Sequence, residues 1–136
     1  MSTPKKTPHP HFDDRGALSW HTKLADALAE AKATGKFVFI EFGRFACGSC
    51  FALVETVLPQ PPIAALLNEH FVCVASDCDH PEPEVMHIGR QHMPHARSLP
   101  FVLYLDSNGN FLYGTTGGRS AEAFKADLDH VLQKKG

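Results

Sequence analysis

The run FVFIEF at residues 37–42 constrains the fold most, because almost every residue in it is apolar. A strand with one side in water alternates apolar and polar residues, whereas a strand covered on both sides is apolar nearly throughout. This run therefore predicts a central parallel strand with helices packed on both faces. FVCVAS at residues 71–76 has the same character and predicts a second buried strand.

A third apolar segment, FVLYLD at residues 101–106, is followed by SNGN and then by FLYG at 111–114. Asn-Gly between two apolar runs is a strong signal for a β-hairpin. Apolar residues at helical spacing predict helices around these strands. The expected helices cover residues 20–34, 47–58, 63–71, 84–92 and 121–132, with prolines interrupting the second, Gly35 ending the first and Ser120 capping the last.

This order of elements predicts an α/β fold, in which a central mixed sheet of about four strands lies between two layers of helices. The length of 136 residues suits a single domain. Residues 1–18 are polar, rich in Pro and His and aperiodic. We expect them to form a flexible arm, or to lie along the surface of a domain spanning residues 19–136, with His9 and His11 in solvent.

Composition and charge give no support to several function classes. Hydrophobic residues make up 43% of the chain, charged residues 21%, and the formal net charge is −2. This balance is ordinary for a globular protein and favours neither nucleic acid nor an anionic membrane as a partner. The first residues include lysines but no apolar core of a secretory signal. We expect a cytoplasmic protein, or a periplasmic one if a leader has been removed.

The motif CGSC places Cys47 and Cys50 directly after the first predicted strand. Such a pair can be a redox couple, half of a metal site or two buried thiols. Where thiols are kept reduced, it is more often catalytic or metal-binding than structural. Cys73 lies in an apolar strand and is expected to be a small buried hydrophobe. Cys78 follows that strand on the same sheet edge as Cys47, either as a third thiol near the site or as a lone loop cysteine.

Four histidines, His80, His87, His92 and His95, fall within 16 residues. Together with the CGSC cysteines they could form a zinc or copper site. Their spacing fits no zinc-finger pattern, however, and the strand before the cysteines suits redox chemistry better. Surface histidines are the simpler interpretation, and no metal is expected.

Three local matches make the chain similar to thioredoxin. CGSC follows the first central strand, Glu41 stands six residues before Cys47 on that strand, and RSLP at 97–100 precedes the hairpin. The likeness covers roughly residues 18–134. It is closest to thioredoxin-like domains of the thioredoxin-7 or DUF255 type, which resemble this chain at residues 20–36 and 65–72.

The resemblance implies a thiol–disulfide oxidoreductase of the disulfide reductase or isomerase type, with no bound cofactor. Cys47, at a helix N-terminus that stabilises a thiolate, would attack a substrate disulfide, and the shielded Cys50 would resolve the mixed disulfide. Glu41, whose charged form is disfavoured by burial, would accept the Cys50 proton. Disulfide-containing proteins or peptides would be the substrates, with a reductase or a low-molecular-weight thiol as electron donor.

The resemblance also implies a substrate-binding surface. The bond before Pro100 is expected to be cis, leaving the Leu99 backbone free to pair with a substrate strand. Ala46 stands where the family has a tryptophan, Phe45 precedes it by one residue, and both are expected to contact substrate. That departure, and Ser49 in place of the family's proline, keeps open a peptide-binding module without turnover.

Overall fold

The computed structural model describes residues 6–134, which contain one mixed five-stranded sheet in the order β1-β3-β2-β4-β5. The β1–β3 and β2–β3 pairs are parallel, and the β2–β4 and β4–β5 pairs are antiparallel. The expected mixed sheet is confirmed, and a two-residue edge strand brings it to five. The strands are β1 (Trp20–His21), β2 (Phe37–Gly43), β3 (Phe71–Asp77), β4 (Phe101–Leu105) and β5 (Phe111–Thr116).

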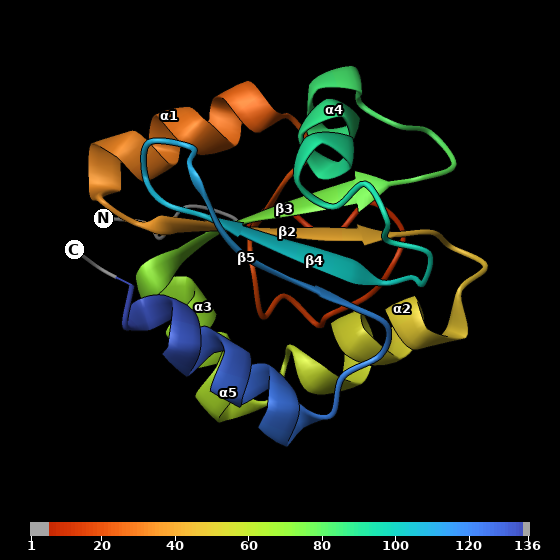
Figure 1. Cartoon of the computed structure of the whole chain (residues 1–136). Helices are drawn as coiled ribbons and strands as arrows, with labels where there is room; N and C mark the ends of the chain where they lie inside the picture. Colours follow the sequence, from red (N-terminus) through yellow and green to blue (C-terminus); the bar gives the residue numbers. More distant parts are fainter. Residues whose placement is uncertain (1–5, 135–136) are drawn as a thin grey trace.

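Helices cover both faces of the sheet, as Figure 1 shows. One face carries α1 (Leu24–Thr34) and α4 (Pro83–His92). The other face carries α2 (Gly48–Ala52), the π-helical segment η1 (Leu53–Val57), α3 (Pro61–His70) and α5 (Ala121–Leu132). The predicted three-layer arrangement is therefore confirmed.

Strand β2 sits at the centre and divides its side chains between two cores. Phe37 and Phe39 pack with residues of η1, α3 and α5, whereas Val38, Ile40 and Phe42 pack with residues of α1 and α4. Because side chains alternate along a strand, Glu41 points to the same face as Phe39, toward α2. Every residue of β2 is buried, as the apolar run predicted.

The predicted ends of several elements are confirmed by their capping geometry. Gly35 ends α1 in the left-handed conformation with φ 72°, which glycine adopts without steric cost. Ser120 caps α5, its Oγ accepting the Ala123 N–H at 3.1 Å. The hairpin turns at Gly109, and the Asp106 N–H donates to the Asn110 carbonyl at 2.9 Å.

Trp20 corrects the expected start of the first helix. It lies in β1 and pairs with Cys73 of β3, and the helix begins four residues later at Leu24. The Trp20 N–H donates to the Thr7 carbonyl at 2.8 Å, and its indole N–H donates to Asp14 Oδ2 at 2.9 Å. Because Trp20 has helical spacing with the residues that follow it, the sequence predicted it as part of the helix. Its hydrogen-bond partners, Thr7 and Asp14, instead lie before it in the chain.

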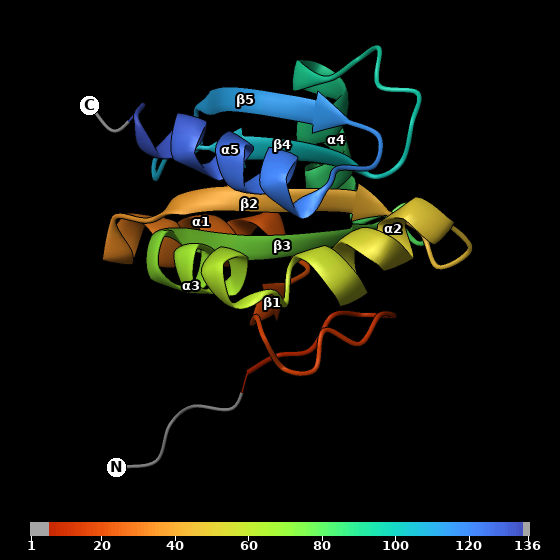
Figure 2. The same cartoon turned by 90° about the horizontal axis from the view of Figure 1, so that it is seen from below.

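The segment 6–18 is packed against the domain rather than flexible. Phe12 and Leu18 belong to the core beneath α2 and α3, and Asp14 is buried while accepting N–H groups from its own turn. His9 is only 5% exposed, so the expectation that it is solvated is wrong, and His11 is half-buried. Figure 2 shows this segment, in red, folding back beside β1 and below α2. Residues 1–5 of the expected arm lie outside the described residues.

The helix expected over residues 47–58 is present but irregular. After α2, the Leu58 N–H bonds the Leu53 carbonyl five residues back at 2.9 Å, which widens the turn before Pro59. Within residues 6–134 no single helix is long and apolar enough to cross a membrane. The pair Gly48–Val57 and Pro61–His70, bent by 88°, meets that test by combined length and composition only.

Candidate active site

Cys47 occupies the N-cap of α2, at the carboxyl end of the central strand. Its backbone is extended, with φ −114° and ψ 112°, and its Sγ accepts the N–H of Cys50 at 3.2 Å. An N-cap side chain meets free backbone N–H groups and the positive end of the helix dipole. The local fold therefore places the Cys47 sulfur at a helix N-terminus, next to a backbone N–H donor.

Cys50 sits one turn further along α2 and is fully buried, while Cys47 is half-buried. All four cysteines lie in the described part of the chain, and all are free thiols. Burial, reinforced by the hydrogen bond with Cys47, raises the pKa of Cys50 to about 12. The pair therefore consists of one accessible sulfur and one shielded sulfur that keeps its proton at neutral pH.

Glu41 is a buried carboxylate beside that shielded thiol. Its exposed fraction is 0%, and its Oε1 lies 2.8 Å from His9 Nε2. Its Oε2 is buried and has no hydrogen-bond partner among residues 6–134. A Cβ placed on Gly43 would lie 2.9 Å from Cys50 Sγ and closer still to Glu41 Oε2. The free oxygen and the thiol therefore face the same small space over Gly43.

The loop before β4 forms a second wall of the site. The Leu99–Pro100 peptide bond is cis, as the family resemblance implied. The Pro100 carbonyl accepts the Gly117 N–H at 2.8 Å, and a Cβ on Gly118 would lie 3.7 Å from Ser49 Oγ. Leu99 packs at the edge of the core that also contacts Cys47, and its backbone N–H and C=O have no hydrogen-bond partner within residues 6–134.

An exposed aromatic surface flanks the cysteines. Phe45 is 69% exposed and Phe51 is 47% exposed, and Ala46 between Phe45 and Cys47 is also exposed. Phe12 from the N-terminal segment stacks on Phe45 at 6.3 Å and meets Phe51 edge-on at 5.9 Å between ring centroids. Sequence reasoning identified Phe45 and Ala46 but missed Phe12 and Phe51.

Arg44 and Cys78 border the site on its other side. The Arg44 guanidinium donates from Nε and Nη2 to Asp79 Oδ1, at 3.1 and 2.5 Å, and this ion pair raises the pKa of Arg44. The Cys78 N–H donates to the Gly43 carbonyl at 2.8 Å, and its half-buried side chain packs beside the α1–α4 core. Burial, with Glu41 next in effect, raises the pKa of Cys78 to about 11.

The histidine group is dispersed. His80 is exposed and contacts Asp77, His92 stacks on Phe111 at 4.8 Å, and His87 and His95 are exposed. In the described part of the chain, no three His, Cys, Asp or Glu side chains are grouped so that they could hold a metal ion. The proposed Cys and His metal site therefore has no support in the geometry.

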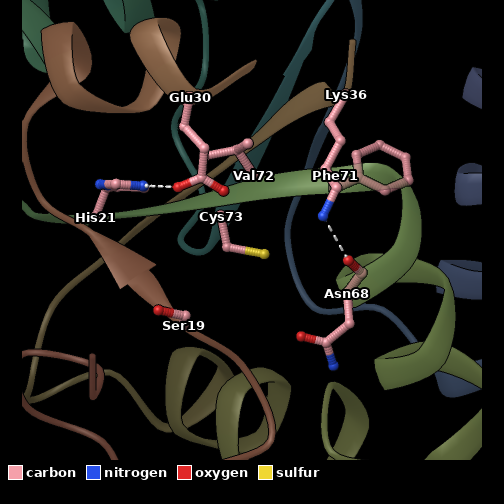
Figure 3. A pocket seen from close by; sticks show the side chains of 8 residues that line it. All are labelled: Ser19, His21, Glu30, Lys36, Asn68, Phe71, Val72 and Cys73. Atoms are coloured by element: carbon pink, nitrogen blue, oxygen red, sulfur yellow. Dashed lines mark hydrogen bonds and ion pairs between the residues drawn. The ribbon is translucent and has the colours of Figure 1, made fainter. Parts of the chain in front are cut away.

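A separate small pocket of about 130 Å³ lies at the β1–β3 edge, away from the CGSC motif. Figure 3 shows the hydrogen-bonded pair His21 and Glu30 on one side and Lys36, bonded to the Asn68 carbonyl, on the other. Cys73 points into it but is buried, as predicted, and burial raises the pKa of its thiol. A thiol that stays protonated is a poor nucleophile, so this pocket is not a second redox site.

Comparison with known proteins agrees with this geometry. The chain is 26% identical to a thioredoxin from Thermus thermophilus, with a TM-score of 0.74, over 88% of this chain and 91% of that one. It is 27% identical to a disulphide isomerase from Xylella fastidiosa Temecula1, with a TM-score of 0.61, over 83% and 88%. No protein with a curated description matches it. The profile of a family described as thioredoxin-like, Thioredoxin_7, matches residues 19–107. The chain therefore belongs to the thioredoxin-like family, with the thioredoxin fold.

Proposed function

We propose that this protein is a thiol–disulfide oxidoreductase that exchanges disulfides through Cys47 and Cys50. One observation carries the proposal. The accessible N-cap sulfur of Cys47 accepts a hydrogen bond from the backbone N–H of the buried Cys50, and a buried carboxylate oxygen of Glu41 faces the Cys50 thiol. The three groups match the three tasks of the reaction, which are attack, resolution and proton transfer.

The reaction begins with the Cys47 thiolate attacking one sulfur of a substrate disulfide. A Cys47–substrate disulfide forms, and the other substrate sulfur leaves as a thiolate. Glu41 Oε2 then accepts the proton of Cys50, whose sulfur bonds to Cys47 Sγ. The bond from Cys47 to the substrate breaks, and the second substrate sulfur leaves with its electron pair. The substrate is reduced by two electrons, and Cys47 and Cys50 become a disulfide.

Substrates of this reaction are disulfide-containing proteins or peptides. The unpaired Leu99 N–H and C=O can bond an extended substrate strand whatever its sequence. Phe45, Ala46 and Phe51 add apolar surface around the attacking sulfur. Restoring the dithiol requires a reductase or a low-molecular-weight thiol, and the proposed site of action is the cytoplasm. The two similar structures, a thioredoxin and a disulphide isomerase, support this class of chemistry.

Reduction of an interchain disulfide peptide, with dithiothreitol as electron donor, tests the proposal. Cys47→Ser should lower turnover to the uncatalysed rate, because the first step has no nucleophile. Cys78→Ser is the matched control, since it removes a half-buried thiol near the same sheet edge that has no assigned step. Full turnover by Cys47→Ser, or loss of turnover in Cys78→Ser, would show that another sulfur does the chemistry.

A further inference from the structure

The N-terminal segment places one side chain, His9, against the site, and none of the reaction steps uses that side chain. His9 lies 32 residues before Glu41, yet its Nε2 is 2.8 Å from Glu41 Oε1, and both side chains are completely buried. The ring is fixed on its other sides too. Trp20 meets it edge-on at 4.9 Å and Phe12 lies tilted against it at 5.3 Å.

The hydrogen bonds of His9 define which ring nitrogen carries the proton. The backbone N–H groups of His11 and Phe12 both donate to His9 Nδ1, at 3.3 and 3.2 Å. An amide N–H can only donate, so Nδ1 must present its lone pair. The remaining hydrogen is on Nε2, which therefore donates to Glu41 Oε1. The direction of the buried bond follows from the fold of the segment 6–18.

This bond determines how the carboxyl group of Glu41 is presented. With Oε1 engaged by His9, the free oxygen is Oε2, which lies over Gly43 beside Cys50 Sγ. A carboxylate that has lost its partner can rotate or take another rotamer, and the distance from Oε2 to the thiol is then no longer fixed. A proton acceptor must be within hydrogen-bond reach of the group it serves.

We propose that His9 is a positioning residue for disulfide resolution, which holds Glu41 so that Oε2 can take the Cys50 proton. The proposal rests on the proposed function, and it makes the N-terminal segment part of the site that carries out disulfide exchange. His9 does not touch the reacting sulfurs, and it acts only through Glu41.

Two substitutions separate the bond to Glu41 from the local turn. In His9→Asn, the side-chain oxygen takes the place of Nδ1 and can still accept the His11 and Phe12 amides, but no donor reaches Glu41. In His9→Gln, the side-chain NH₂ takes the place of Nε2 and can still donate to Glu41. If His9 only anchors the segment, His9→Asn should slow resolution by Cys50 less than His9→Gln does. If His9 positions Glu41, His9→Gln should slow it less.

The assay is a single turnover with 5,5′-dithiobis(2-nitrobenzoate) at pH 7, in a Cys78→Ser background. Attack by Cys47 releases the first thionitrobenzoate, and resolution by Cys50 releases the second. His9→Asn should slow the second release about tenfold, the usual effect of losing a hydrogen bond to a charged group. The first release should stay within about twofold of the parent, since Cys47 is untouched. His9→Gln should restore the second release to within about threefold of the parent.

The Glu41→Gln background shows whether His9 acts through Glu41. Glu41→Gln alone should slow the second release about a hundredfold, within the range for loss of a general base. Adding His9→Asn to Glu41→Gln should change it by less than about twofold. The role of His9 would be overturned if His9→Asn slowed the second release as much in the Glu41→Gln background as in the parent. It would also be overturned if His9→Asn and His9→Gln slowed that release equally. If the parent itself never releases the second thionitrobenzoate, the proposed function fails instead.

Discussion

Gly43→Ala tests the central geometry of the site by filling the space that Glu41 and Cys50 share. The new Cβ would lie 2.9 Å from Cys50 Sγ and 3.2 Å from Cys50 Cβ, and closer than either to Glu41 Oε2. Carbon contacts are comfortable at about 3.5–4.0 Å. Both neighbours are buried and Cys50 belongs to a helix, so the strand, the helix or the carboxyl group must move.

The expected cost is about 1–3 kcal/mol of unfolding free energy, which is typical of one extra methyl group in a packed core. Urea unfolding followed by Trp20 fluorescence measures it, since the indole is buried in the same core. The midpoint should fall with little change in slope. Resolution by Cys50 should also slow, because the methyl group displaces Glu41 Oε2 from the thiol.

Gly48→Ala is the matched control. Gly48 is the first residue of α2, and a Cβ there would meet nothing within 4 Å. Its stability should stay within about 0.5 kcal/mol of the parent. If Gly43→Ala is as stable as Gly48→Ala and resolves the mixed disulfide at the parent rate, Glu41 and Cys50 do not share this space. The assigned proton transfer then fails with it.

Three further outcomes follow from burial and charge. Iodoacetamide at pH 7.5 should label Cys47 and spare Cys50, because Cys50 is buried and its pKa is raised to about 12; equal labelling in mass spectrometry would contradict this. Burial raises the pKa of Cys73, so above pH 9 the unfolded chain releases a proton that the folded chain keeps, and stability falls as pH rises. In urea titrations between pH 9 and 11, Cys73→Ala should flatten that decline by up to about 1.4 kcal/mol per pH unit, and an unchanged slope would show that Cys73 titrates normally. Asp127→Asn breaks a bidentate pair between a buried carboxylate and the half-buried Arg119, and should lower the unfolding free energy by about 1–3 kcal/mol. Asp129→Asn, in an exposed pair with Lys125, should lower it by under about 0.5 kcal/mol, and equal losses would refute the distinction.

The fold could be predicted because its signals are local. FVFIEF encodes a doubly covered strand through composition alone, and Asn108-Gly109 marks the hairpin turn. Gly35 and Ser120 marked the helix ends for the same reason, since caps depend on one or two side chains. Helical spacing failed at Trp20, because the spacing describes which residues share a face and not where the backbone changes conformation.

The site could be predicted only in part, because half of it depends on contacts between distant segments. Cys47 and Cys50 lie in one motif, and Glu41 lies on the strand before it. His9 gave no such signal, since it sits in an aperiodic polar segment and meets Glu41 only after folding. The available clue was indirect: an acid in a buried strand needs a hydrogen-bond partner. With nine histidines in the chain, that clue did not single out one.

The burial of Phe12 shows the same limit. An isolated aromatic residue in a polar segment carries no period, so its partners Phe45 and Phe51 could not be inferred from spacing. The turn at Asp14 and the hydrogen bond between Thr7 and Trp20 hold the segment against the domain. In this position Phe12 contacts the aromatic surface beside the cysteines.

Trapping the mixed disulfide tests most directly whether Cys47 attacks the substrate and Cys50 resolves the mixed disulfide. Cys50→Ser is incubated with a disulfide peptide, and the products are mapped by mass spectrometry without reduction. A stable adduct is expected on Cys47 in Cys50→Ser and none in Cys47→Ser, because Cys47 is the attacking sulfur and Cys50 the resolving one. An adduct on Cys78 or Cys73 instead, or one that persists in Cys47→Ser, would contradict it.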